Sequence, residues 1–218
     1  MAAEYVEQFF LDGSLLLTTY ENCRTHEDLV RRDAREGKVN YHLLHGSQAV
    51  SGIQGVGKRS FMLCASSTLS AEMMTRFGTK NWIEIIDPLA FAEAISRKLP
   101  GFLQLRMAPC RYVSERSVER QTARPIMPDP AQLLQAARSG AYGGVEAAFH
   151  AMNRELADRL TDELDDDPYF IKEAVPFDVE DEFRFVWTVS DEVISPLVVN
   201  CKEASKYCLP GFSGAYAK

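Results

Sequence analysis

The stretch VEDEFRFVW, residues 179–187, decides the fold, because it reads as a β-strand with two unlike sides. Aromatic residues recur on one side at period two and predict a strand anchored in a hydrophobic core. The other side carries three charged residues, Glu180, Glu182 and Arg184. Two interpretations of this charged side stay open: a solvated surface on which Arg184 pairs with the glutamates, or a site. The aromatic residues are Phe183, Phe185 and Trp187.

Strand and helix signals are mixed along the chain without the regular alternation of a doubly wound sheet, so we predict an α+β fold with a mixed or mostly antiparallel sheet and flanking helices. The last two predicted strands are expected to form a hairpin that turns at Ser190-Asp191. Strands are predicted at 14–20, 39–44, 60–65, 82–86, 103–113 (interrupted at Pro109), 169–172, 182–189 and 193–199. Helices are predicted at 4–11, from Thr25 to about Gly37, at 70–77 and at 88–98.

The middle of the chain differs from the rest. Residues 114–130 lack apolar periodicity and end in a cluster of prolines, which predicts an exposed connection or loop. Helical patterns follow at 131–138 and 145–164. We therefore predict a single domain, 1–218, with an insertion at about 114–165. The insertion is expected to begin with a loop and to become helical near residue 129.

Composition limits the class of protein. The chain has 218 residues, 46% hydrophobic and 25% charged, and a net charge of -7, which argues against charge-driven adhesion to nucleic acid or anionic membranes. The five cysteines form no CxxC pair, which favours reduced thiols and gives little support for structural zinc. Neither a signal peptide nor a stretch long enough to span a membrane is recognisable. We expect a cytoplasmic protein that does not bind membranes.

Several familiar motifs are incomplete here. GIQGVGK, residues 52–58, has the spacing of a phosphate-binding loop, but Arg59 stands where the motif needs Ser or Thr, so a hairpin turn is the better interpretation. His42 and His45 would point to opposite sides of a strand, which is poor geometry for a metal. The acidic run at 162–168 lacks the ligand spacing of an EF-hand. We expect no metal site.

Arginines accumulate in the predicted loop. Arg116, Arg120 and Arg124 would line one side if the loop became helical on a partner, and could then contact phosphates. The alternative is a solvated loop in which Glu115 and Glu119 partly offset the positive charge.

Several motifs together resemble one of the large bacterial and phage families of unknown function, which occur near mobile elements and defence genes. The resemblance covers most of the chain except roughly 114–165, and it implies an intracellular toxin or defence effector. The motifs are GSLLLTTYENCR, the R-x-D-x-x-E-G of Arg31, Asp33, Glu36 and Gly37, FMLCASST, WIEIIDPLAF, and K-x4-F-x2-E-x-E-x-R from Lys172 to Arg184.

A second similarity, to ADP-ribosyltransferases, rests on the E-x-E formed by Glu180 and Glu182. In those enzymes the second glutamate holds the ribose of NAD and stabilises an oxocarbenium-like transition state, while the first orients the acceptor. The resemblance implies Glu182 as the catalytic carboxylate, Glu180 as its helper, and NAD contacts from Ser66 and Ser67. The first strand lacks the Arg or His of that family, and Arg24 is the nearest substitute.

Two functional hypotheses follow. One is an NAD-consuming enzyme, either a glycohydrolase or a transferase acting on a nucleic-acid or protein acceptor, with a cognate antitoxin or regulator. The other is a non-catalytic module that binds a protein or nucleic acid through the Arg116–Arg124 loop. The enzyme hypothesis requires the glutamates to meet the strand that carries Ser66 and Ser67. On that strand Cys64 is either a reactive thiol or a small buried residue.

Overall fold

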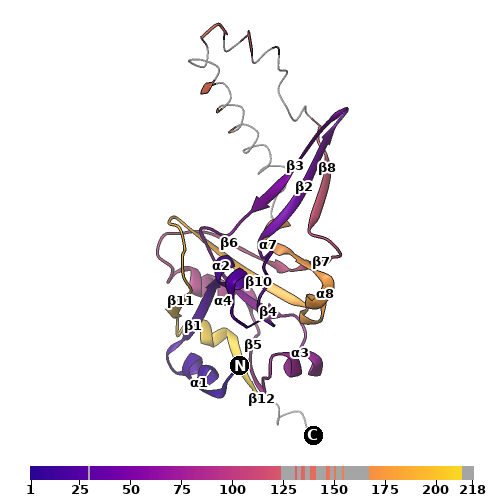
Figure 1. The fold of residues 1–218 in the computed structure, drawn as a ribbon. Coiled ribbons are helices and arrows are strands. Elements are labelled where there is room, and N and C mark those ends of the chain that lie inside the picture. Colours follow the sequence, from indigo (N-terminus) through magenta and orange to yellow (C-terminus); the bar gives the residue numbers. More distant parts are fainter. Residues whose placement is uncertain are drawn as a thin grey trace. The chain divides into compact units, whose positions relative to one another are not determined.

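The structure is a computed structural model and describes residues 1–28, 30–123 and 167–212, with scattered positions between 131 and 154. The fold is α+β, as predicted. The predicted helical insertion at 129–165 lies for the most part outside the described residues. By its contacts the chain divides into two compact units (Figure 1). Unit 1 comprises Met1–Gly37, Val56–Ser114 and Tyr169–Lys218, and unit 2 comprises Lys38–Gly55 and Glu115–Pro168.

Unit 1 is built on a five-stranded antiparallel sheet with the strand order β11-β1-β4-β10-β6. The strands predicted at 14–20, 60–65 and 182–189 are confirmed. The segment predicted at 103–113 splits into β6 and a second strand in another sheet, and the strand predicted at 193–199 begins only at Leu197. The predicted hairpin of the last two is wrong: both edges of β10 are occupied by β4 and β6, so β11 pairs with β1 instead. The strands are β1 (Ser14–Thr19), β4 (Ser60–Ser66), β6 (Phe102–Pro109), β10 (Glu182–Val189) and β11 (Leu197–Asn200).

The aromatic side of β10 packs on helix α4 (Pro88–Ser96), which Asp87 caps by accepting a hydrogen bond from the Ala90 N–H at 3.0 Å. The rings of Phe91 and Phe185 meet edge to face, 5.6 Å apart. Trp187 is fully buried, and its indole N–H donates to the carbonyl of Ala92 at 3.2 Å. The predicted core side of this strand is confirmed.

One predicted helix is misplaced. The helix expected from Thr25 to Gly37 is replaced by α2 (Tyr20–Thr25), and turns follow it. The hydroxyl of Thr19 accepts a hydrogen bond from the Asn22 N–H at 3.0 Å and so starts a helix directly after β1. The other helices lie where predicted, at α1 (Ala3–Asp12) and α3 (Ala71–Arg76).

Two small strand pairs complete unit 1. β5 (Asn81–Ile85) pairs antiparallel with β12 (Cys208–Phe212), and β7 (Arg111–Val113) pairs parallel with β9 (Ile171–Glu173). The strand expected to begin at Tyr169 begins instead at Ile171, after the short helix α7 (Asp167–Phe170). The segment then continues through α8 (Ala174–Phe177) and a 3₁₀ turn, η1 (Asp178–Glu180); a second 3₁₀ turn, η2 (Ala204–Tyr207), precedes β12.

Unit 2 contains a three-stranded sheet in the order β3-β2-β8, where β2 (Lys38–His45) pairs antiparallel with β3 (Gln48–Gly55) and parallel with β8 (Ser117–Gln121). The hairpin turn expected at 52–58 is therefore strand in its first half, since residues 52–55 belong to β3. Gly52 lies opposite Tyr41, and a Cβ at that glycine would stand 2.2 Å from the tyrosine hydroxyl, so the glycine leaves space for the ring. The loop expected at 114–130 likewise contains β8.

Candidate functional site

The two glutamates of the E-x-E motif lie on either side of a left-handed residue. Glu182 is the first residue of β10, whereas Glu180 ends η1. Between them Asp181 has φ 41° and ψ 52°, the one positive φ at a non-glycine position in the described part of the chain. Its carbonyl accepts a hydrogen bond from the Ser67 N–H at 2.8 Å, which secures the turn. The expected alternation of both glutamates along one strand is therefore wrong.

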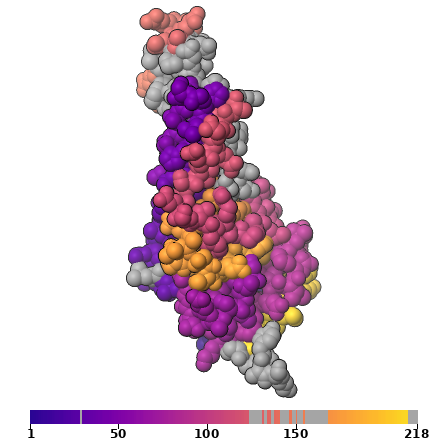
Figure 2. Space-filling view, turned by 90° about the vertical axis from the view of Figure 1, so that its right-hand side faces the viewer, coloured from indigo at the N-terminus to yellow at the C-terminus, as the bar shows by residue number. Residues whose placement is uncertain are grey.

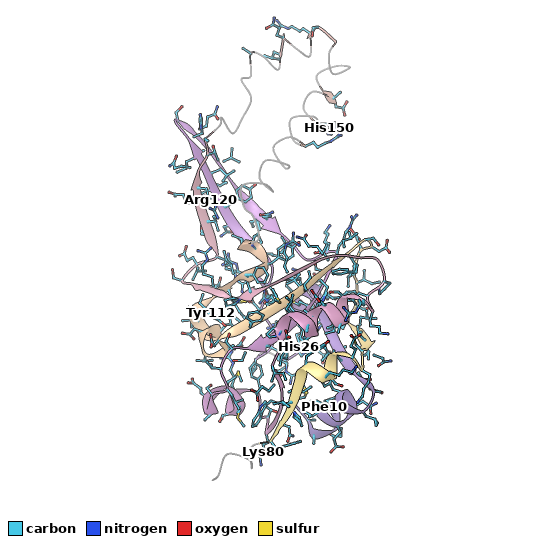
Figure 3. The ribbon with its side chains drawn as sticks, turned by 180° about the vertical axis from the view of Figure 1, so that it is seen from behind. Phe10, His26, Lys80, Tyr112, Arg120 and His150 are labelled. Carbon is cyan, nitrogen blue, oxygen red and sulfur yellow. The ribbon has the colours of Figure 1, made fainter. Side chains whose placement is uncertain are left out.

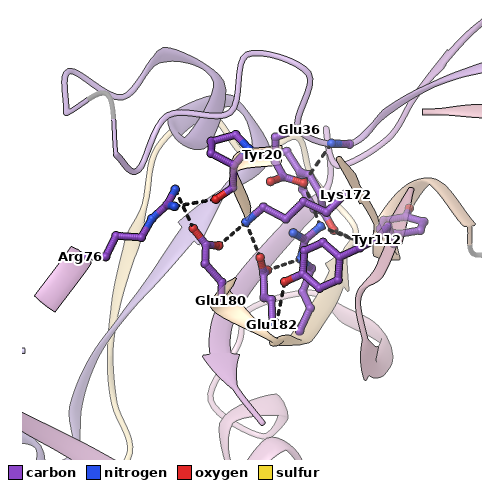
Figure 4. A network of polar contacts seen from close by, with 11 residues as sticks. Tyr20, Glu36, Arg76, Tyr112, Lys172, Glu180 and Glu182 are labelled. Carbon is purple, nitrogen blue, oxygen red and sulfur yellow. Dashed lines mark hydrogen bonds and ion pairs between the residues drawn. The ribbon is translucent and has the colours of Figure 1, made fainter. Parts of the chain in front are cut away.

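The turn nevertheless brings both carboxylates to one ammonium group. Lys172, on β9, donates a hydrogen bond to Glu180 Oε2 at 2.6 Å and to Glu182 Oε2 at 2.6 Å (Figure 4). The same ammonium lies 4.6 Å from the centre of the Phe177 ring, in cation–π geometry. One lysine thus neutralises part of the charge of both glutamates.

Arg184 binds the other side of Glu182. Its Nε donates to Glu182 Oε1 at 2.7 Å, and its Nη1 donates to Glu36 Oε1 at 2.9 Å and to the Tyr169 carbonyl at 2.6 Å. Both oxygens of Glu182 are therefore bound by cations. Glu36 comes from the turn region after α2, so residues far apart in the chain meet at this point.

The main chain at Glu182 is also fixed. Its N–H donates to the Tyr112 hydroxyl at 2.8 Å, and its carbonyl accepts from the Cys110 N–H at 2.7 Å. Tyr112 lies opposite Lys172 in the pairing of β7 with β9. The small parallel pair therefore positions the start of β10, and Figure 3 locates Tyr112 in the unit.

Burial excludes the solvated-surface interpretation of the charged side. The side chains of Arg184, Glu182, Lys172 and Glu180 are 0%, 3%, 8% and 12% exposed. Each charge removed from water costs several kcal/mol, which only close partners and hydrogen bonds offset. Buried charges that are retained at this cost are candidates for a functional site.

The two glutamates differ in proton affinity. Burial raises the pKa of Glu180, and the nearby ammonium of Lys172 only partly opposes this. Burial would also raise the pKa of Glu182, but Arg184 and Lys172 outweigh it and hold that pKa well below its usual range. Neighbouring carboxyl groups with proton affinities driven apart are typical of acid–base sites.

Glu180 lies at the accessible edge of this network. Arg76 of α3 stands 3.5 Å from Glu180 Oε1 and 5.8 Å from the centre of the Phe177 ring. A shallow depression of about 500 Å³ adjoins this edge and is lined by Ala71, Glu72, Thr75, Arg76 and Val179. The segment from Tyr169 to Glu180 forms part of the molecular surface here, shown in orange in Figure 2.

The residues predicted to contact NAD lie around the same network. Ser66 is the direct partner of Glu182 in the pairing of β4 with β10, and Ser67 binds the main chain of Asp181. Arg24 donates to the carbonyl of Glu36 at 2.7 Å, and the carboxylate of Glu36 accepts from Arg184. The structure thus brings the glutamates, the serines and Arg24 into one region of unit 1.

The arginines predicted to contact a partner belong to unit 2 and do not form one exposed row. Arg116 is fully buried, which contradicts its predicted place on an exposed loop. Its carbonyl accepts a hydrogen bond from the Asn40 N–H at 2.8 Å, so β8 is anchored where the loop was expected. Arg120, labelled in Figure 3, lies on β8 and is exposed, and Arg124 lies outside the described residues.

Cys64 lies opposite Arg184 in the pairing of β4 with β10. By accessible surface the residue as a whole is exposed, whereas protein atoms crowd around its sulfur; this crowding, and then the charge of Glu182, raise the pKa of the thiol well above its usual value. A thiol that stays protonated is a poor nucleophile. In the described residues no cluster of three or more His, Cys, Asp or Glu side chains is arranged to hold a metal ion.

Our sequence interpretation assigned no role to Lys172, Glu36, Tyr112 or Arg76. Lys172 and Glu36 stand within the motifs that carry the family resemblance, and these motifs are the sequence feature that could have pointed to them as site residues. Tyr112 and Arg76 reach the site through pairing and packing that the sequence does not encode locally. No protein-family model, curated protein or solved structure matches the chain.

Proposed function

We propose that the chain is a carboxylate-dependent enzyme that consumes NAD, either as a glycohydrolase or as an ADP-ribosyltransferase. One observation carries the proposal: two buried glutamates share a lysine, and their surroundings drive their proton affinities in opposite directions. Cleavage of an N-glycosidic bond is helped by an ionised carboxylate that stabilises the positive charge developing on the sugar, and by a group that takes the proton of the attacking acceptor.

Each glutamate has its own task in this reaction. The bond between the anomeric carbon of NAD and the nicotinamide nitrogen breaks, and its electron pair neutralises the departing pyridinium nitrogen. Positive charge develops on the ribosyl group, and the carboxylate of Glu182, whose pKa is held well below its usual range by Arg184 and Lys172, stabilises it electrostatically. An acceptor hydroxyl or water then forms the new bond to that carbon and gives its proton to Glu180, the more exposed carboxylate.

The burial of Glu182 favours Glu180 as the group that contacts the substrate. Ser66, Ser67 and Arg24 support the proposal because they lie around the same network, where hydroxyl groups and a guanidinium can bind ribose and phosphate. The depression beside Arg76 offers a place for part of the substrate.

The biological setting belongs to the same proposal: a cytoplasmic toxin or defence effector, controlled by a cognate antitoxin or regulator, that modifies a nucleic-acid or protein acceptor. All five cysteines are free, and free thiols are common in proteins of reducing compartments. No helix in the described residues is long and apolar enough to cross a membrane. Exposed Arg120 is the described member of the arginine set that could meet an acceptor.

Nicotinamide release from NAD by the purified full chain tests the proposal. Wild-type protein should release nicotinamide, and Glu182→Gln and Glu180→Gln should each lower the rate by about 100-fold or more. Glu84→Gln, at an exposed glutamate of β5, is the matched control and should retain the wild-type rate. Unchanged NAD binding, turnover and cellular toxicity in Glu182→Gln would rule out the enzyme.

The second candidate is a non-catalytic module that binds a protein or nucleic acid through unit 2. The exposure of Arg120 on β8 favours it. Because Arg116 is buried, charge reversal there would disturb folding, so Arg120→Glu with Arg124→Glu is the better test. If partner capture survives this double change, the binding module loses its basis.

A further inference from the structure

Lys172 binds both glutamates. Its ammonium makes two hydrogen bonds of 2.6 Å, one to each carboxylate, and packs on the Phe177 ring. A lysine stem is flexible in solution and loses much rotamer freedom when it is ordered in this way. The pairing of β9 with β7 fixes its backbone, so the ammonium is delivered to a set position.

The two glutamates depend on Lys172 to different degrees. Glu182 keeps a second close cation, because Arg184 Nε lies 2.7 Å from its other oxygen. Glu180 has Arg76 as its other cation, at the longer distance of 3.5 Å. Removal of the ammonium would therefore leave Glu182 paired and Glu180 poorly compensated in a largely buried setting. A buried carboxylate without a close cation takes up a proton.

We infer that Lys172 is a positioning residue that fixes the side chain of Glu180 and keeps it ionised until a substrate arrives. It acts through Glu180 and itself contacts no reacting atom. The consequence for catalysis rests on the proposed function, whereas the effect on the charge of Glu180 does not. The two are therefore tested by separate measurements.

Carboxyl-carbon NMR of the full chain, with ¹³C-labelled glutamate, measures the charge of each glutamate directly. Glu180→Gln and Glu182→Gln assign the two signals. In Lys172→Met, Glu180 should bind its proton at least about tenfold more tightly, and Glu182 should change much less because Arg184 remains. Lys172→Arg should restore most of the difference. Lys80→Met, at an exposed lysine labelled in Figure 3, is the control.

Either of two results would overturn the inference: an unchanged titration of Glu180 in folded Lys172→Met, or equal changes at both glutamates. If this variant does not fold, the wild-type protein still decides the question. The ¹⁵N signal of the Lys172 ammonium should be protected from solvent exchange and coupled to both carboxyl carbons. A rapidly exchanging, uncoupled ammonium would exclude the role.

Turnover supplies the catalytic readout. Lys172→Met should lower kcat for nicotinamide release by about 100-fold, with a smaller change in KM. Activity should also be lost at a higher pH on acidification than in the wild-type protein. If wild-type protein releases no nicotinamide, the proposed function fails while the NMR titration still decides the role of Lys172. If turnover is present but Glu180 titrates identically in both proteins, the inference fails alone.

Discussion

Tyr112 and Lys172 face each other across the parallel pairing of β7 with β9, and both reach Glu182. The tyrosine hydroxyl accepts the main-chain N–H of Glu182 at 2.8 Å, and the lysine ammonium donates to its carboxylate at 2.6 Å. Two neighbouring residues of one small sheet thus hold the backbone and the side chain of the same glutamate. The position of this carboxylate depends on both contacts.

Removal of the Tyr112 hydroxyl should weaken the start of β10. Tyr112→Phe leaves the N–H of Glu182 without its acceptor, so we expect a loss of about 1–2 kcal/mol in the free energy of unfolding. Urea denaturation measures it. Tyr5→Phe, at a residue 69% exposed, is the control and should have no measurable effect. A Tyr112 variant as stable as wild type would mean that the contact carries no net energy.

Loss of the Arg184 guanidinium should be far more costly. Arg184→Met leaves Glu182 and Glu36 buried without this partner, and we expect destabilisation by about 3–5 kcal/mol. Arg97→Met breaks an exposed pair with Glu203 and should cost less than about 1 kcal/mol. Thermal and urea denaturation measure the loss of stability in the two variants. Similar losses would show that burial does not make the removal of one charged partner more costly than it is at the surface.

Stability should depend on pH in opposite ways at the two glutamates. The pKa of Glu182 is lowered in the folded protein, so its contribution is present above the unfolded value of 4.5 and is lost as pH falls toward the folded value. The pKa of Glu180 is raised, so its contribution is greatest at low pH and declines as pH rises through 4.5 and the higher folded value.

The two Gln variants measure this contrast. The stability difference between wild type and Glu182→Gln should grow with rising pH, and that between wild type and Glu180→Gln should shrink. Urea denaturation between acidic and neutral pH gives both differences. The same trend in both variants would contradict the assignment of unlike environments.

The left-handed residue between the glutamates should respond to side-chain shape. Asp181→Val places a β-branched residue at φ 41°, which should cost about 1–2 kcal/mol of stability, whereas Asp181→Gly should be close to neutral. Asp178→Val, at a neighbouring position of negative φ in η1, is the control. If valine is tolerated equally at both positions, the turn is not held in its observed conformation.

The sequence predicted much of the fold because local patterns suffice for its main elements. Period two in residues 183–187 was enough to identify the core side of β10, and Asp87-Pro88 was enough to start α4. Pairing between strands far apart in the chain was not predictable. β8 pairs with β2, and β11 pairs with β1, but the sequence of a strand does not by itself specify its partner.

For a related reason, the charged residues of the candidate site could be predicted from the sequence, but their burial could not. Alternation places Glu182 and Arg184 on one side of a strand, but it does not say whether water or another layer of protein covers that side. Lys172 covers it here, from β9, ten residues before Glu182 in the chain. The charge pattern therefore suggested a site, whereas the burial that gives the site its electrostatics appears only in three dimensions.

The two unlike sides of β10 also protect the sheet from mispairing. A shift of this strand by one residue would turn Trp187 toward the charged layer and force Arg184 into the hydrocarbon layer against α4. An unpaired buried charge costs several kcal/mol, whereas the free energy of unfolding of a typical protein is only about 5–15 kcal/mol. Two such charges would therefore cost on the order of the whole free energy of unfolding. Misregistered sheets are thus too unstable to compete, and the charged residues act as a check on strand alignment during folding.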